Sequence, residues 1–327
     1  MLTSVVPHER TGWCALDAAD RSTVEGIARA LVAQADGRVD DPAFVSAARR
    51  RAGELPSRLR RPLAEFRRYS GQTGTLVLRG LPVGDVSTAE TPMVAGSVQR
   101  AATVAAGVLI TVATELGDPV AYHAEKSGAL VQDVVPVPGR ENTQENTGSV
   151  LLEFHNENAF HDFRPDYVML LCLRPDHDRV AGLRTACVRQ VLPLLDSSTR
   201  EALAAPEFIT SAPPSFCVGG DTEPHAVFNG AREDPDLRVD FAATTGLTDR
   251  ARNALKTLQR MFVEVALTVH MEPGDLAIVD NRVAAHGRTS FRPRYDGGDR
   301  WLQRTFVAVD IRRSRAFRPG DGYVLVG

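Results

Sequence analysis

The chain lacks the features that assign a sequence to a class at first sight. Its 327 residues include four cysteines, and none of these forms a CxxC pair, so neither a zinc ribbon nor a disulfide framework is indicated. No apolar run approaches the roughly 18 residues that a membrane helix needs, and the first residues contain no apolar signal-peptide stretch. We therefore expect a cytoplasmic protein with free thiols and no membrane partner.

An excess of charge of either sign is also missing. The formal net charge is -3 at pH 7, and charged residues make up 24% of the chain. The arginines within residues 49–51 and 58–61 lie among acidic and apolar residues, a pattern typical of a solvated helix face. This balance indicates no nucleic-acid partner and leaves the oligomeric state open.

Hydrophobic residues recur at helical spacing through the first third of the chain. Helices are predicted over residues 22–35, 43–55, 59–69 and 94–116. The first of them opens with Ser22 and Glu25 in a capping-box pattern, and a strand is expected over 75–80. Residues 1–118 are thus predicted to form a mainly helical part.

Short strands separated by Gly, Pro and Asn are expected in the remainder. They are predicted over residues 167–173, 183–188, 276–279 and 301–310. One more helix is expected over 249–270. Residues 206–235 are rich in Pro, Gly and Ser, and so long an irregular segment favours an active-site lid. The sequence predicts a single domain, 1–327, of the β-rich α+β class, with a jelly-roll (double-stranded β-helix) core and buttressing helices.

Two separate blocks of sequence carry the residues of a metal site. His155 and Glu157 are two positions apart, so on a strand both side chains project from one face. His286 supplies a second imidazole from far downstream. Two histidines and one carboxylate are the ligands of non-haem Fe(II) oxygenases. Zinc hydrolases use the same set, usually in an HExxH motif that this sequence lacks.

An arginine downstream of His286 narrows the chemistry. Arg300 lies 14 residues beyond that histidine, at the start of an alternating strand. A buried arginine there needs an anionic partner, because an unpaired buried charge is costly. A dicarboxylate cosubstrate supplies one, since the guanidinium fork matches a carboxylate with two hydrogen bonds. This spacing favours an oxygenase over a zinc-type hydrolase.

The blocks HNENAFHDFRPDYV, DNRVAAHGR and FRPRYDGGDRWLQR resemble those of the clavaminate-synthase-like Fe(II)/2-oxoglutarate oxygenases. Within that family they are similar to the branch that hydroxylates free L-amino acids, such as the asparagine, arginine and lysine hydroxylases. The resemblance covers most of the chain. It implies Fe(II), 2-oxoglutarate and O₂ as cofactors, and hydroxylation at C3 or C4 of a free amino acid with a nitrogen-containing side chain, giving succinate and CO₂.

The resemblance also implies roles for individual residues. His155, Glu157 and His286 match the iron ligands, and Arg300 with Thr185 matches the residues that hold 2-oxoglutarate. Substrate contacts are implied for Arg304, Glu125, Asn146 and Asp240. The family's usual HTE is HNE here, and the middle residue is expected to point away from the metal. Arginine and lysine hydroxylases tend to have a second acid where this chain has Ala242, so the substrate side chain stays undecided.

Several of these residues have a purely structural interpretation as well. Glu125 would then be a surface acid, Asn146 a turn residue, Asp240 a cap for the following turn, and Arg304 part of an ion pair. His161, Asp162, Arg288, His123 and His270 are interpreted as structural or surface residues. A halogenase would need a small residue in place of Glu157, whereas a desaturase, a zinc hydrolase and a non-catalytic binding protein remain rival functions.

Overall fold

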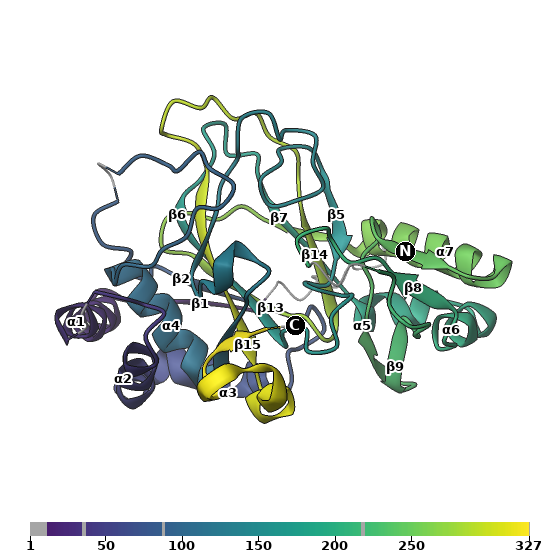
Figure 1. The fold of residues 1–327 in the computed structure, drawn as a ribbon, viewed down its shortest axis with the longest axis horizontal. Coiled ribbons are helices and arrows are strands. Elements are labelled where there is room, and N and C mark those ends of the chain that lie inside the picture. Colours follow the sequence, from purple (N-terminus) through teal and green to yellow (C-terminus); the bar gives the residue numbers. More distant parts are fainter. Residues whose placement is uncertain (1–11, 35–36, 87–88, 217–219, 327) are drawn as a thin grey trace, which may run out of the picture.

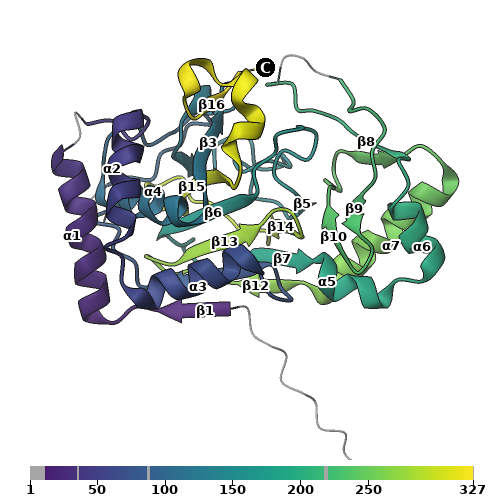
Figure 2. The ribbon, with the colours of Figure 1, turned by 90° about the horizontal axis from the view of Figure 1, so that it is seen from below.

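The computed structural model of the chain describes residues 12–34, 37–86, 89–216 and 220–326. Its strands form an eight-stranded sheet, a four-stranded sheet and two two-stranded ribbons. Helices α1 and α2 lie at one end of the molecule, and α6 and α7 lie at the opposite end (Figures 1 and 2). The α-helices are α1 (Ala18–Gln34), α2 (Pro42–Ala52), α3 (Ser57–Arg68), α4 (Val104–Leu116), α5 (Val188–Val191), α6 (Ser197–Leu203) and α7 (Asp249–Val265).

Within the described ranges, no helix combines the length and the apolar character that crossing a membrane requires. The described cysteines, Cys14, Cys172 and Cys187, are free thiols, as expected. Cys217 lies outside the described residues.

The N-terminal part is mainly helical, as predicted, but two helix starts were predicted wrongly. Helix α1 begins at Ala18 rather than residue 22, because Asp17 accepts a hydrogen bond from the Asp20 amide and occupies the capping position. Helix α4 begins only after Thr103, whose hydroxyl accepts from the Ala106 amide. Residues 94–103 were expected to be helical. Residues 97–99 instead pair with residues 131–133, where the Gln99 amide donates to the Val131 carbonyl, 3.0 Å away, and Ala101 pairs with Arg38.

The eight-stranded sheet separates two hydrophobic cores. Its central strand β6 alternates between them: Tyr167 and Met169 pack with helices α1 to α4, whereas Val168 and Leu170 face the four-stranded sheet. Both faces are therefore buried, which explains why this strand is a continuous apolar run. The strands are β1 (Gly12–Ala15), β2 (Thr75–Arg79), β13 (Leu276–Asp280), β6 (Tyr167–Arg174), β15 (Trp301–Ala308), β3 (Asp118–Tyr122) and β16 (Val324–Leu325), with β4 (Gln132–Val134) paired to β15.

The four-stranded sheet carries the residues of the predicted metal site. Its order is β12 (Leu267–Val269), β7 (Leu183–Cys187), β14 (Ala284–Arg288) and β5 (Leu152–His155), and all its pairs are antiparallel. The helix predicted over 249–270 is correct only as far as Val265. Residues 267–269 leave the helix because they form β12 and pair with Leu183–Thr185 of β7.

The segment 206–235 is less irregular than its composition suggests. It contains β8 (Phe208–Thr210), β9 (Phe228–Ala231) and the start of β10 (Asp234–Leu237). Strand β8 pairs with β11 (Thr244–Gly246), and β9 pairs with β10. The described loop residues 211–216 and 220–227 lie between β8 and β9, so the loop is shorter than the predicted segment.

Gly287 permits the close pairing of β14 and β5. A Cβ atom at this position would lie 2.5 Å from the Leu152 carbonyl oxygen. We therefore expect Gly287→Ala to lower the free energy of unfolding by about 1–3 kcal/mol, the usual cost of overpacking. Gly26→Ala is the control, because its Cβ would meet nothing within 4 Å in α1, and alanine should stabilise the helix by about 0.5–1 kcal/mol. Urea unfolding measures both; equal effects would contradict the expectation.

Candidate active site

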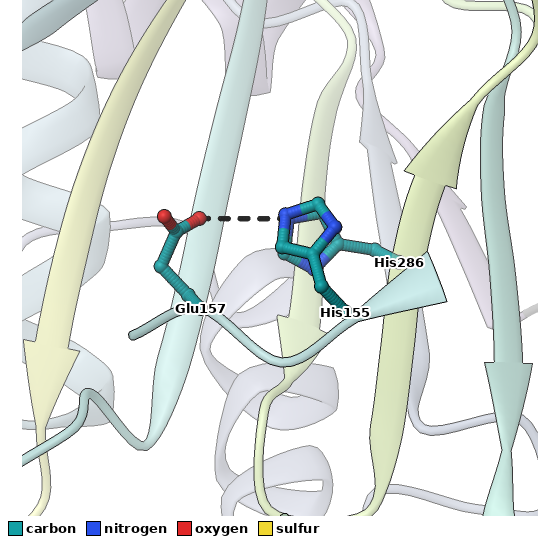
Figure 3. A group of neighbouring side chains, drawn as sticks. All are labelled: His155, Glu157 and His286. Carbon is teal, nitrogen blue, oxygen red and sulfur yellow. Dashed lines mark ion pairs between the residues drawn. The ribbon is translucent and has the colours of Figure 1, made fainter. Parts of the chain in front are cut away.

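His155, Glu157 and His286 come together at the end of the four-stranded sheet (Figure 3). His155 ends β5 and lies directly across from His286 on β14, with ring centroids 4.4 Å apart. Glu157 follows two residues later, and its Oε2 atom is 3.6 Å from His286 Nε2. One possible ligand atom of each residue lies within 4.8 Å of the others. The arrangement can hold one metal ion.

The protonation states at this cluster suit metal binding, which requires deprotonated ligands. Burial alone would raise the pKa of the Glu157 carboxyl, but Arg304 and the two imidazoles outweigh it and hold that pKa well below its usual range. Burial, together with the neighbouring His155, lowers the pKa of His286 to about 4. At neutral pH the cluster therefore offers a carboxylate and a neutral imidazole.

Hydrogen bonds leave the metal-facing atoms of two residues available. His155 Nδ1 lies 2.9 Å from the Glu153 carbonyl oxygen, which fixes the ring and leaves Nε2 free. Glu157 Oε1 accepts from Arg304 at 3.0 Å. Glu157 Oε2 is buried and has no hydrogen-bond partner in the described part of the chain. A buried orphan oxygen of this kind fits a cation, so the residues present match an Fe(II) site.

Two asparagines, which sequence analysis did not select, position the cluster. Asn156 is 1% exposed; its amide nitrogen donates to the carbonyls of Asn281 and Ala284 at 2.9 and 3.0 Å, and its oxygen accepts from the Val239 amide. Asn281 is fully buried and bonds both the amide and the carbonyl of Glu157. The Asn156 side chain is thus used in bonds to backbone groups. The paired HNE and DN motifs were the available signal.

Arg304 links the metal cluster to the expected substrate residues. It is 5% exposed and donates to Glu157, to Glu125 and to Gln132, whose Oε1 atom is 2.5 Å away. Arg304 Nε and Glu125 Oε2 are both buried without a partner among the described residues. Burial raises the pKa of Glu125, while Arg304 opposes that shift. Gln132 was missed because glutamine on a short strand carries no distinctive pattern.

A left-handed turn sets the position of Glu125. Lys126, Ser127 and Gly128 have φ values of 47°, 54° and 71°. Non-glycine residues adopt this conformation at a cost of roughly 1–2 kcal/mol each. The Lys126 ammonium group offsets part of this cost because it donates to the backbone carbonyl of Asp133. Burial, together with nearby Arg304, lowers the pKa of Lys126 to about 8.

Arg300 borders a cavity of ≈ 680 Å³ that also reaches the three clustered residues, whereas Thr185, the other predicted cosubstrate residue, is not among the residues that line it. Arg300 is 6% exposed, and it has no hydrogen bond or ion pair with any residue that the structure describes. Thr185 is opposite His286 on β7, and its buried hydroxyl likewise lacks a partner within the described ranges. The Arg300 guanidinium is therefore available to an anionic ligand in the cavity.

Asn146 and Asp240 also line this cavity. Asn146 is half-buried in the loop before β5. Asp240 faces His155 through a backbone bridge, and its Oδ1 accepts from the Ala242 amide at 2.8 Å. The structural interpretation of Asp240 as a turn cap is thus correct, but the carboxylate borders the cavity at the same time.

The residues interpreted as structural divide into two groups. His161 packs edge-on against Tyr122 with ring centroids 5.0 Å apart, while Asp162, His123 and His270 are exposed. Arg288, in contrast, is 4% exposed and lines the cavity beside the metal cluster.

Another set of possible metal ligands, His177, Asp296 and Asp299, has a structural explanation. Both oxygens of Asp299 accept backbone N–H bonds, from residues 294 and 295.

Comparison with known proteins agrees with this geometry. Residues 208–306 match the family model "Taurine catabolism dioxygenase TauD, TfdA family". The chain is 61% identical to the L-asparagine oxygenase of Streptomyces coelicolor over 95% of this chain and 93% of that enzyme. It is 36% identical to clavaminate synthase 2 of Streptomyces clavuligerus, over 84% of this chain and 86% of that enzyme.

A solved structure of asparagine oxygenase with Fe(II), 2S,3S-3-hydroxyasparagine and succinate matches the fold with a TM-score of 0.93. That match is 60% identical and covers 96% of this chain and 98% of the other. Together with the site, these findings define an Fe(II)/2-oxoglutarate-dependent dioxygenase, which uses O₂ and hydroxylates a free amino acid. The chain belongs to the clavaminate-synthase-like family of these oxygenases, in the branch of the amino acid hydroxylases. A zinc-type hydrolase is thereby set aside.

Removing His286 tests the metal cluster. We expect His286→Ala to abolish binding of one Fe(II) per chain in anaerobic calorimetry, because only His155 and Glu157 would remain of the set. His270→Ala is the control, since His270 is exposed and lies outside the cluster. Stoichiometric Fe(II) binding by the His286 variant would remove this residue from the ligand set.

Removing Asn156 tests the support of the cluster. Asn156→Ala leaves two buried carbonyls and one amide without this partner, so we expect the free energy of unfolding to fall by about 1–3 kcal/mol. Affinity for Fe(II) should fall as well, because the segment between His155 and Glu157 loses its bonds to the backbone of Asn281, Ala284 and Val239. Asn229→Ala, at an exposed position, is the control. An Asn156 variant as stable as wild type, with unchanged iron affinity, would show that the asparagine is dispensable.

Proposed function

We propose that this enzyme hydroxylates free L-asparagine at C3, with His155, Glu157 and His286 as the iron ligands. The observation that carries the substrate proposal is that Asp240 lines the cavity, whereas the position two residues later, where arginine and lysine hydroxylases tend to have a second acid, is Ala242. One carboxylate accepts from a neutral carboxamide NH₂ group, whereas a guanidinium or ammonium group would need more negative charge. The 61% identity to an L-asparagine oxygenase supports the same substrate.

Arg304 and Glu125 would hold the common part of the amino acid. The unpartnered Arg304 Nε can donate to the α-carboxylate, and the unpartnered Glu125 Oε2 can accept from the α-ammonium group. Asn146 has an amide that can pair with the substrate's own carboxamide. These contacts would place the Cβ–H bonds of the substrate toward the metal cluster, which is consistent with attack at C3.

Iron bound by the three ligands supplies the activation of O₂, coupled to decarboxylation of 2-oxoglutarate. The chain's own contribution is to bind and orient. Arg300 would hold the distal carboxylate of 2-oxoglutarate, and the Thr185 hydroxyl would add a further donor. Glu157 keeps its place in the ligand set, which argues against a halogenase, because halogenation needs that position vacated.

We infer that the loop after β8 acts as the lid. The supporting observation is that Ser211, Pro213 and Phe216 line the cavity from one side. Residues 217–219 lie outside the described ranges, so the proposal concerns the described part of segment 206–235. A lid would exclude water while the substrate is oxidised.

We also infer that the eight- and four-stranded sheets form the two halves of a jelly-roll core within a single domain. The proposal is supported by the hydrophobic core between them, which includes Val168, Leu170 and Ala284. The likeness to TauD-type oxygenases supports it too. Strand β6 contributes to both cores, so the N-terminal helices and the sheets share one folding unit.

A substrate comparison tests the asparagine proposal. With Fe(II), ascorbate and 2-oxoglutarate, we expect L-asparagine to give succinate and a product heavier by one oxygen atom, with the hydroxyl at C3 by NMR. L-aspartate, L-glutamine, L-arginine and D-asparagine are the matched comparisons, and each should give far less succinate. The proposal fails if another amino acid is preferred, or if asparagine gives succinate without gaining oxygen.

A further inference from the structure

Arg288 is a buried cation that the reaction described above does not use. Its guanidinium donates one hydrogen bond, from Nη2 to the Val150 carbonyl at 3.0 Å, and lies 5.2 Å from the centre of the Phe291 ring. Nε is buried without a partner, and no acid that the structure describes lies within ion-pair distance. A guanidinium has five N–H donors. One carbonyl and one ring therefore satisfy only part of its hydrogen-bonding capacity.

A second buried cation, Arg300, makes it more costly for Arg288 to lack a negatively charged partner. Arg300 borders the same cavity and also lacks an ionic partner among the described residues. Arg288 keeps its charge at neutral pH, as arginine does in proteins, and it lies near the charge of Arg300. Two buried positive charges facing one cavity are stable together only if an anion joins them.

The strand geometry relates Arg288 to the metal cluster. Arg288 follows His286 by two residues on β14, so both side chains project into the cavity. Two residues of a strand span roughly 7 Å, a length comparable with a short dicarboxylic acid. The opposite residues on β7 repeat the relation: Thr185 faces His286, and Leu183 faces Arg288. The His286–Thr185 pair is thus polar and contains a metal ligand, and the Arg288–Leu183 pair two residues further along carries a cation.

Part of the cavity wall is apolar. Leu170, Leu183 and Leu302 line the cavity together with Val134. Such a wall suits the two methylene groups of 2-oxoglutarate, whose polar groups lie only at its ends. A monocarboxylic 2-oxo acid would fit the same wall but would leave both guanidinium groups without a counter-charge.

We propose that Arg288 is a second binding residue for the distal carboxylate of 2-oxoglutarate, acting with Arg300, and that this pair selects dicarboxylic over monocarboxylic 2-oxo acids. The inference rests on the metal cluster and the role of Arg300 proposed above. It assigns the cosubstrate a direction along β14, from His286 toward Arg288. The product succinate carries the same distal carboxylate, so the pair also binds the product.

Binding of two cosubstrate probes tests this role without relying on turnover. The Fe(II) enzyme is titrated anaerobically with 2-oxoglutarate and, separately, with 2-oxopentanoate, which has the same chain but no distal carboxylate. Calorimetry gives each Kd for wild type, Arg288→Met and Arg288→Lys. Arg184→Met is the control, because Arg184 lies on the adjacent strand over the Phe154 ring, outside the cavity.

Arg288→Met should raise the Kd for 2-oxoglutarate about ten- to a hundredfold, the range expected for a lost hydrogen bond to a charged group. The Kd for 2-oxopentanoate should not change, and Arg288→Lys should recover part of the loss. Equal weakening of both acids would mean that Arg288 only supports the local fold, and no weakening of either would also overturn the proposal. If Arg288→Met does not fold, Arg288→Lys must show the selective loss on its own. Wild type that fails to bind 2-oxoglutarate would instead refute the proposed metal and Arg300 site.

Discussion

The hydrogen bonds of Asn156 and Asn281 are the constraint on which the active site depends. They join the loop that carries Glu157 to the loop that precedes His286, across more than a hundred residues of sequence. Strand pairing alone places His155 opposite His286, but Glu157 lies beyond the end of β5 and has no ladder to hold it. The side-chain amides of Asn156 and Asn281 hold this part of the chain instead. Strand pairing therefore positions the two histidines, and side-chain hydrogen bonds position Glu157.

The buried charges around Glu157 neutralise one another only as a group. Arg304 sits between the carboxylates of Glu125 and Glu157, so one buried cation neutralises part of two buried anions. Breaking one member of such a group is more costly than its own contact, because the remaining charges stay buried. A metal cation beside Glu157 would add positive charge next to the two carboxylates, and a zwitterionic substrate would offer its carboxylate to Arg304 and its ammonium group to Glu125. Binding at the two places is thereby linked through a single guanidinium.

Sequence patterns identified the chemistry better than the supporting structure. His155, Glu157, His286, Arg300 and Arg304 were selected from spacing and from the family resemblance, and all five line one cavity. The strand spacing used for His155 and Glu157 does not describe this structure, because β5 ends at His155. The start of α4 and the end of α7 were predicted wrongly. Local composition there is compatible with a helix, and distant pairing with Val131 and with β7 decides otherwise. Arg288 was underrated because exposure cannot be deduced from one arginine in a sequence, and Asn156 because its partners are backbone atoms.

The left-handed turn at residues 126–128 matters for attempts to change the substrate specificity of the enzyme. Arg100 bonds both the Ser127 carbonyl and Asp40, so the turn is fastened to the segment between α1 and α2. The carboxylate that would receive the substrate amine thus owes its location to backbone and to the N-terminal helical part. Exchanging side chains around the cavity can alter which side chain is accepted. With the substrate contacts proposed above, it would leave the anchoring of the amino acid's common end in place, and redesign would be confined to Asn146 and Asp240.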